Sequence, residues 1–248
     1  MSAAPAASAG PAAGTGRLKD RVVLVTGASR GLGRAVALAA AAEGAHLVLV
    51  ARTVGALEEL DDLQRKLTGL SAVLVPQDLM EQDAIDRLGA ALYQRFGRLD
   101  GLFAAAATLG QLSPVGHIPP KVWDQVMGLN LTVNYRLIRS LDPLLRRSDA
   151  GRAVFVTDRT GRDIAYWPPY SASKAALESL VLSWAGELRQ TPLRATLVAP
   201  RPFVSRLRRA AFPGEKQEGL ATAESLAPAI LPLLLPASSR QGEIVAVG

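Results

Sequence analysis

Short β-branched segments alternate with longer segments rich in alanine and leucine from residue 17 to residue 248. The short segments have the length and composition of strands, and the longer ones carry apolar residues at helical spacing. We expect strands at Val22–Thr26, His46–Ala51, Ala72–Pro76, Gly101–Ala105, Ala153–Thr157, Ala195–Val198 and Ile244–Val247. We expect helices at Arg34–Glu43, Val54–Lys66, Asp83–Phe96, Lys121–Leu145, Ser173–Arg189 and Ser225–Leu235. This alternation predicts an α/β protein, a Rossmann-type doubly wound parallel sheet with helices on both faces.

Residues 17–248 contain no linker or change of composition, so we expect a single domain there. Residues 1–16 are nearly all Ala, Pro, Ser, Gly and Thr, which cannot bury a core, and we expect a disordered tail. They lack the charged start and long apolar run of a signal peptide. The longest apolar stretches, 35–42 and 226–236, are too short to span a bilayer. We therefore expect a soluble, cytoplasmic protein with no membrane partner.

The composition excludes several kinds of site. The chain of 248 residues has no cysteine and only two histidines, His46 and His117, so disulfides, thiolate metal sites and histidine clusters are excluded and we expect no metal. A net charge of +6 raises the question of nucleic acid. The arginines are scattered apart from a cluster at Arg206, Arg208 and Arg209, and no aromatic-interleaved motif occurs, so we expect no nucleic-acid partner.

A glycine-rich turn follows the first predicted strand. Gly27-Ala-Ser-Arg-Gly31-Leu-Gly33 leads from that strand directly into an alanine-rich helix. Such a turn aims backbone amides and the positive end of the helix dipole at an anion, and a side chain at Gly31 or Gly33 would obstruct the ligand. With a strand before it and a helix after it, the turn predicts a site for a dinucleotide pyrophosphate.

The ends of the next two strands indicate which dinucleotide is bound. An acidic residue at the end of the second strand would favour NAD, but this chain has Arg52 there. Arg52 and Arg30 can pair with a 2′-phosphate, which favours NADP(H); the alternative is that Arg52 is a solvated arginine. Asp78, after the third strand, could accept a hydrogen bond from an adenine amino group or cap the following helix.

A tyrosine and a lysine lie four residues apart in Tyr170-Ser-Ala-Ser-Lys174, directly after the fifth predicted strand. On one helix face, a nearby ammonium lowers the pKa of a phenol and relays protons. The phenol can then donate its proton to a carbonyl oxygen as a hydride arrives.

The motifs Thr26–Gly33, Gln77–Leu79, Asn130 and Tyr170–Lys174 together resemble the short-chain dehydrogenase/reductase family, and the resemblance covers residues 17–248. Within the family, the segments 18–20, 122–127, 148–151 and 211–213 look most like a bacterial YciK-type branch. The resemblance implies a seven-stranded sheet, a nicotinamide cofactor and reversible carbonyl/alcohol chemistry. It also implies that Tyr170 is the acid/base, that Lys174 binds the nicotinamide ribose and tunes Tyr170, and that Asn130 holds a proton-relay water. The expected cofactor contacts are Gly27, Ser29, Arg30, Gly31, Leu32, Gly33, Arg52, Thr53, Asp78, Leu79, Ala105, Tyr170 and Lys174.

Three positions depart from the family pattern. Ala104–Ala107 replaces Asn-Asn-Ala-Gly, which removes side chains that brace the sheet, and Arg201 replaces a glycine, which either weakens cofactor binding or adds a ligand contact. The serine that orients the substrate carbonyl is matched by Asp158 when counted from Gly161, and by Thr157 when counted from Tyr170. A Thr157 hydroxyl could serve as the oxyanion donor.

An ionised Asp158 would repel the oxyanion unless it were protonated or paired with Lys174. Its alternative role is a carboxylate at the end of a strand, facing solvent or Arg159.

Other segments have two interpretations each. Residues 200–221 form either a lid over the site or an ordinary surface excursion, and Tyr166 and Trp167 either line a substrate wall or pack the loop. Two predicted helices carry apolar residues around more than one face, which favours a homodimer or homotetramer, as in the resembled family. These residues are Val122, Val126, Val133, Leu137 and Leu141, and Ala176, Leu177, Leu180, Val181, Trp184 and Leu188.

The sequence thus predicts an NADP(H)-dependent oxidoreductase that transfers a hydride between nicotinamide and a small carbonyl or alcohol substrate. The expected catalytic residues are Tyr170, Lys174 and Asn130, with Thr157 or Asp158 in place of the serine. The alternative is a redox-inactive regulatory or partner protein that binds NADP on the same fold.

Overall fold

The computed structural model describes residues 15–248, so residues 1–14 of the expected tail lie outside the described part. The last two residues of that tail contact the domain. Thr15 Oγ1 donates a hydrogen bond of 3.2 Å to Glu43, and the Gly16 carbonyl accepts one of 3.0 Å from the Lys19 amide. Glu43 is buried, and its hydrogen bonds and ion pair with Arg17 lower its pKa to about 2.

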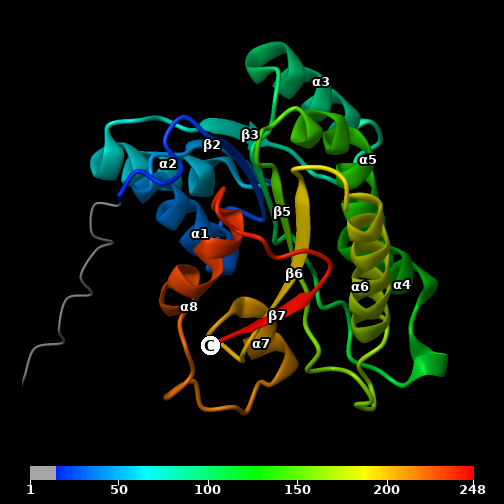
Figure 1. Ribbon diagram of the computed structural model, residues 1–248. Coiled ribbons are helices and arrows are strands. Elements are labelled where there is room, and N and C mark those ends of the chain that lie inside the picture. Colours follow the sequence, from blue (N-terminus) through cyan, green and yellow to red (C-terminus); the bar gives the residue numbers. More distant parts are fainter. Residues whose placement is uncertain (1–14) are drawn as a thin grey trace, which may run out of the picture.

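Seven parallel strands form one twisted sheet in the order β3-β2-β1-β4-β5-β6-β7 (Figure 1). The strands are β1 Val22–Thr26, β2 His46–Ala51, β3 Val73–Pro76, β4 Gly101–Ala104, β5 Arg152–Val156, β6 Arg194–Pro200 and β7 Ile244–Val247. The side chains of the central strands are mostly buried on both faces, as is typical of a parallel sheet, whereas those of the edge strands β3 and β7 are mostly only partly buried. The strand order reverses between β1 and β4, where open α/β sheets bind ligands beyond the carboxyl ends of their strands. The predicted doubly wound sheet is confirmed.

Helices cover both faces of the sheet (Figure 1). One face packs against α1 Gly31–Ala42, α2 Val54–Thr68 and α8 Ala223–Ile230, followed by a 3₁₀ turn at Leu231–Leu234. The other face packs against α3 Ala84–Phe96, α5 Val133–Arg146 and α6 Tyr170–Glu187. The remaining helices are a 3₁₀ turn at Val115–His117, α4 Pro120–Met127 and α7 Arg206–Ala211. Within residues 15–248, none of the helices combines the length and the apolar character needed to span a bilayer.

The helix predicted over 121–145 is present, from Pro120 to Arg146, but it is not α-helical throughout. A π-helical turn, Gly128–Thr132, separates α4 from α5 and turns Asn130 into the protein. Such turns add a residue to the helical repeat and are frequent at functional sites. The helix predicted over 225–235 is also divided, because α8 ends at Ile230 before the 3₁₀ turn that contains Pro232.

The apolar residues cited for an oligomer interface pack mostly against other parts of the same chain. Eight of the eleven are buried against the sheet and neighbouring helices, and Val122, Ala176 and Leu180 are partly buried. The second apolar face that the sequence predicted is therefore largely covered within the chain. Assembly into a dimer or tetramer stays a prediction without that argument.

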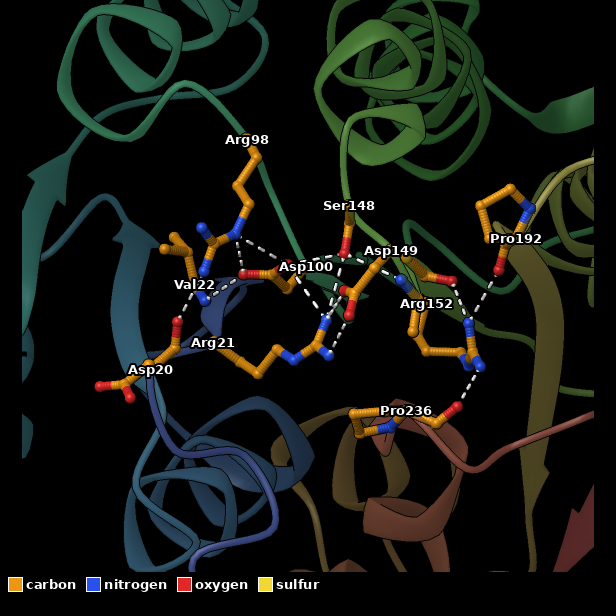
Figure 2. A network of polar contacts seen from close by, with 12 residues as sticks. Asp20, Arg21, Val22, Arg98, Asp100, Ser148, Asp149, Arg152, Pro192 and Pro236 are labelled. Atoms are coloured by element: carbon orange, nitrogen blue, oxygen red, sulfur yellow. Dashed lines mark hydrogen bonds and ion pairs between the residues drawn. The ribbon is translucent and has the colours of Figure 1, made fainter.

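The amino ends of three strands are joined by a polar network, shown in Figure 2. Asp100, just before β4, accepts hydrogen bonds from the Val22 amide at 2.9 Å and from Ser148 Oγ at 2.6 Å. Arg21 and Arg98 also pair with this carboxylate. The network closes the end of the sheet opposite the carboxyl ends of the strands, and it therefore serves the fold rather than a ligand site.

Candidate active site

A cavity of about 720 Å³ opens at the carboxyl ends of the strands. The turn after β1, the ends of β2 to β5, the start of α6 and the segment after β6 supply its lining. All the residues predicted to contact a cofactor line it: Gly27, Ser29, Arg30, Gly31, Leu32, Gly33, Arg52, Thr53, Asp78, Leu79, Ala105, Tyr170 and Lys174. The fold therefore brings these residues, distant along the chain, around one cavity, and their contacts with a cofactor stay a prediction.

The glycines of the β1–α1 turn have different roles. Gly31 begins α1 with φ +53°, and no protein atom lies within 4 Å of the position its Cβ would occupy, so this place is open for a ligand. A Cβ on Gly33 would lie 2.3 Å from the Gly27 carbonyl oxygen. Gly33 is therefore also needed for packing α1 against its own turn, a role that the sequence did not indicate, and its role toward a ligand stays a prediction.

Arg52 lies at the rim of the cavity. Its side chain is 69% exposed, and Nη1 is 4.0 Å from the Asp78 carboxylate. Asp78 also accepts a 3.0 Å hydrogen bond from the Met80 amide, which closes a turn directly after β3. Since α3 begins at Ala84, Asp78 does not cap that helix. Arg30, at the N-cap of α1, is exposed and lines the same part of the cavity.

Tyr170 is the first residue of α6 and Lys174 lies one turn later, as the motif predicts. Both are buried; the Tyr170 hydroxyl donates to Asp158 Oδ2 at 3.1 Å, and Lys174 Nζ donates to the Val156 carbonyl at 2.8 Å. Burial raises the pKa of Tyr170 well above its usual value, and the Asp158 charge adds to this effect. Burial lowers the pKa of Lys174 to about 8, against the opposite influence of Asp158 and Glu178. The pKa of Tyr170 is therefore raised and not lowered here, because burial and the Asp158 charge outweigh any influence of the Lys174 ammonium.

Asp158, not Thr157, lies beside the phenol. Its second carboxylate oxygen, Oδ1, accepts a 2.8 Å hydrogen bond from the Thr160 amide. Thr157 is completely buried, and its hydroxyl donates to Glu178 Oε1 at 2.8 Å. The hypothesis that Thr157 supplies an oxyanion donor is therefore corrected: its proton is already committed to Glu178, while Asp158 holds the place beside Tyr170.

Glu178 supports the site through Thr157, a role that the sequence analysis missed. It lies one helical turn after Lys174, is buried, and accepts hydrogen bonds from Thr157 and from Arg162. The spacing of four residues from Lys174 was a usable signal, but the pairing with Thr157 and Arg162 arises only in the folded chain. This cluster fixes the end of β5 and the loop after it against α6.

Asn130 braces the site from behind the cavity. It is fully buried, and its side-chain amide forms two hydrogen bonds of 2.9 Å with the backbone of Thr108 and donates to Ser173 Oγ at 3.0 Å. Its own carbonyl accepts from Asn134 Nδ2 at 2.7 Å. Asn130 thus joins the segment after β4 to the first turn of α6, and its role with a relay water stays a prediction.

The segments that depart from the family pattern also line the cavity. Ala105, Ala106 and Ala107 follow β4 there and offer only methyl groups, while the Ala106 amide donates a 3.4 Å hydrogen bond to Thr26. Arg201 follows β6, where its amide donates to the Val247 carbonyl at 2.9 Å. The strand ends therefore keep their shape without the usual asparagines and glycine.

Trp167 packs the loop and is not a cavity wall. Its ring is buried, lying 5.9 Å from the Tyr170 ring and 5.5 Å from the Phe212 ring between centroids. Tyr166 is exposed, with its backbone in the left-handed region at φ +71°. The structure thus supports loop packing over the alternative of a substrate wall, and Trp167 connects Tyr170 with the segment after β6.

Comparison with known proteins agrees with this geometry. The model of the family described as short chain dehydrogenase matches residues 21–216. The chain belongs to the short-chain dehydrogenase family. The Escherichia coli K12 protein described as the uncharacterized oxidoreductase YciK is 34% identical to this short-chain dehydrogenase over 227 residues, which is 90% of each chain.

Two solved structures resemble it with sequence identities of 32%. A short-chain dehydrogenase from Shigella flexneri 2a, complexed with NADP, has a TM-score of 0.89 and covers 94% of this chain and 99% of its own. One from Escherichia coli CFT073, complexed with NADPH, has a TM-score of 0.88 with the same coverage.

Proposed function

We propose that this short-chain dehydrogenase is an NADP(H)-dependent oxidoreductase that interconverts a small carbonyl compound and its alcohol. The observation that carries the proposal is the juxtaposition of Tyr170 and Lys174 with the glycine turn around one cavity. The structures of its relatives with NADP and NADPH support the choice of cofactor.

The residues present fit a phosphorylated dinucleotide. The open space beside Gly31 and the start of α1 offer amides and the positive end of a helix dipole to a pyrophosphate. Arg52 and Arg30 would hold the 2′-phosphate, because a guanidinium forms paired hydrogen bonds with phosphate oxygens. When bound, the nicotinamide supplies or accepts the hydride.

Tyr170 would supply the proton. Its hydroxyl lines the cavity and is the acidic group at the start of α6 from which a carbonyl oxygen could receive a proton. Lys174 lies one turn behind it, with its ammonium 5.8 Å from the tyrosine ring centroid, and favours the phenolate that remains after proton transfer. Asn130 holds both the segment after β4 and the first turn of α6 in place.

Asp158 limits this chemistry. The Tyr170 proton points at a carboxylate instead of at an incoming oxygen, and a second negative charge beside a developing oxyanion raises the barrier. We therefore expect slow turnover in the wild-type protein. The same contact favours the second candidate function, a redox-inactive regulatory or partner protein that binds NADP.

One experiment separates the two functions. Binding of NADPH is measured by calorimetry, and NADPH consumption is followed by absorbance across a panel of aldehydes and ketones with the wild-type protein and Tyr170→Phe. An oxidoreductase consumes NADPH only with substrate and loses this activity in Tyr170→Phe. Tight NADPH binding without consumption would favour the regulatory function.

A further inference from the structure

The cavity carries more positive charge than its acidic groups balance. Seven basic and three acidic side chains line it. Four of the basic side chains come from one short segment after β6, namely Arg201, Arg206, Arg208 and Arg209. This segment also contains the tight arginine cluster of the sequence, to which the proposed function gives no role.

One of these arginines is structural. Arg208 forms two hydrogen bonds with Glu215, of 2.6 and 2.7 Å, and its guanidinium lies 3.9 Å from the Phe212 ring centroid. Phe212 in turn packs on Trp167, which packs on Tyr170. Arg208 therefore holds α7 against the candidate catalytic tyrosine and is not free for a ligand.

The ends of the segment are fixed as well. The Val204 amide donates to the Ala221 carbonyl at 2.9 Å, and the Ser205 side chain caps α7 by accepting from the Arg208 amide at 3.0 Å. The position of α7 at the cavity is thus set by contacts from both sides.

Arg206 and Arg209 differ from Arg208. Three residues apart on α7, they lie on one side of the helix, both are exposed, and both line the cavity. Neither has an acidic partner within 4.0 Å among residues 15–248.

The three acidic lining residues do not neutralise this pair. Asp78 faces Arg52 at the far rim, and Asp158 accepts the hydrogen bond from Tyr170. Glu224 lies in the first turn of α8, where it complements the helix dipole.

We infer that Arg206 and Arg209 bind an oxoanion group, a carboxylate or a phosphate, on the substrate. The inference rests on the proposed function, because it assigns the substrate class of the same cavity. The cofactor phosphates have their own donors at the β1–α1 turn and at the end of β2. Strands β4 and β5 separate β1 from β6, so the two sets of donors start about 14 Å apart at strand spacings of about 4.8 Å. A guanidinium pair that lines the same cavity as Tyr170 is suited to orient a carbonyl compound by its acidic end.

The test compares matched ligands with the NADP⁺ complex of the full chain, in which a ketone cannot be reduced. One arm titrates 4-oxopentanoate and longer keto acids against their methyl esters, and the other titrates 2-oxopropylphosphonate against its dimethyl ester. The variants are Arg206→Gln/Arg209→Gln and, as a control, Arg189→Gln, which changes an exposed arginine outside the cavity. Circular dichroism and thermal melting verify that each variant is folded, and NADPH affinity is measured separately.

We expect at least one acid to bind about tenfold or more tightly than its ester, the scale of a charged hydrogen-bond contact. If the keto acids show the preference over their esters, the site binds a carboxylate; if the phosphonate shows it, the site binds a phosphate. The double variant should lose the preference while keeping NADPH affinity, and Arg189→Gln should keep both.

Equal binding of acids and esters by the wild-type protein would overturn the inference. So would a double variant that binds NADPH weakly but still prefers the acid, because the arginines would then serve the cofactor. An acid preference without any NADPH consumption would support the anion site and count against the proposed oxidoreductase, so the two claims fail separately.

Discussion

The Tyr170 hydroxyl donates its hydrogen bond to the Asp158 carboxylate, 3.1 Å away, at the cavity that we assign to hydride transfer. A neutral hydroxyl at this position would leave the phenol proton for the substrate and could itself donate to an oxyanion. A carboxylate can do neither, because both of its oxygens accept hydrogen bonds here, one from Tyr170 and one from the Thr160 amide. We therefore expect Asp158 to control how much acid catalysis the site can perform.

Replacing Thr157 should affect stability more than chemistry. In Thr157→Ala, the buried Glu178 loses one of its two side-chain donors, and we expect the free energy of unfolding to fall by about 1–3 kcal/mol. Thr157→Ser keeps the hydroxyl and should recover most of this loss. Denaturant unfolding measures the change, and an equally stable Thr157→Ala with much slower turnover would show that the hydroxyl serves the substrate instead.

The pH dependence of reduction should report Lys174. Burial lowers its pKa to about 8, so the side chain loses its positive charge as the pH rises through this value. An uncharged Lys174 no longer favours the Tyr170 phenolate, and kcat should therefore fall above pH 8. Lys174→Arg stays charged and should lose this descending limb, whatever its absolute rate. A limb that is identical in both proteins would assign the titration to another group.

Arg52 should determine the choice between the two dinucleotides. Arg52→Asp replaces a phosphate partner by a carboxylate that repels it, and we expect NADPH to bind at least about tenfold more weakly, with NADH equal or preferred. Arg95→Asp, an exposed change on α3 outside the cavity, provides the matched control. If calorimetry finds the same ratio of NADPH to NADH affinity in Arg52→Asp and in the wild type, the phosphate site lies elsewhere.

The parts of the fold that follow local rules were predictable. The strand–glycine–helix pattern around Gly27 and the Tyr170-x-x-x-Lys174 spacing place their residues correctly, because each depends on a few neighbouring positions. The choice between Thr157 and Asp158 was not predictable, because it depends on how the loop after β5 meets α6. Thr157 and Glu178 are 21 residues apart, and their hydrogen bond forms only when strand and helix pack.

The π-helical turn between α4 and α5 could not be predicted for a related reason. Apolar residues continue at helical spacing through Gly128–Thr132, and the π-helical turn is held by the contacts of Asn130 with Thr108 and Ser173. These are tertiary contacts, and the spacing of apolar residues along the sequence does not predict them.

The most direct measurement of the central claim is NADPH consumption with a carbonyl panel by wild type, Asp158→Ser and Asp158→Ser/Tyr170→Phe. Serine removes the repulsion and restores a donor, so we expect turnover to rise by roughly one to three powers of ten over wild type, and the added Tyr170→Phe change to abolish the gain. NADPH affinity, measured in parallel, should stay the same. If Asp158→Ser binds NADPH and still reduces no carbonyl compound, or if its activity survives the loss of the Tyr170 hydroxyl, the proposed mechanism is contradicted.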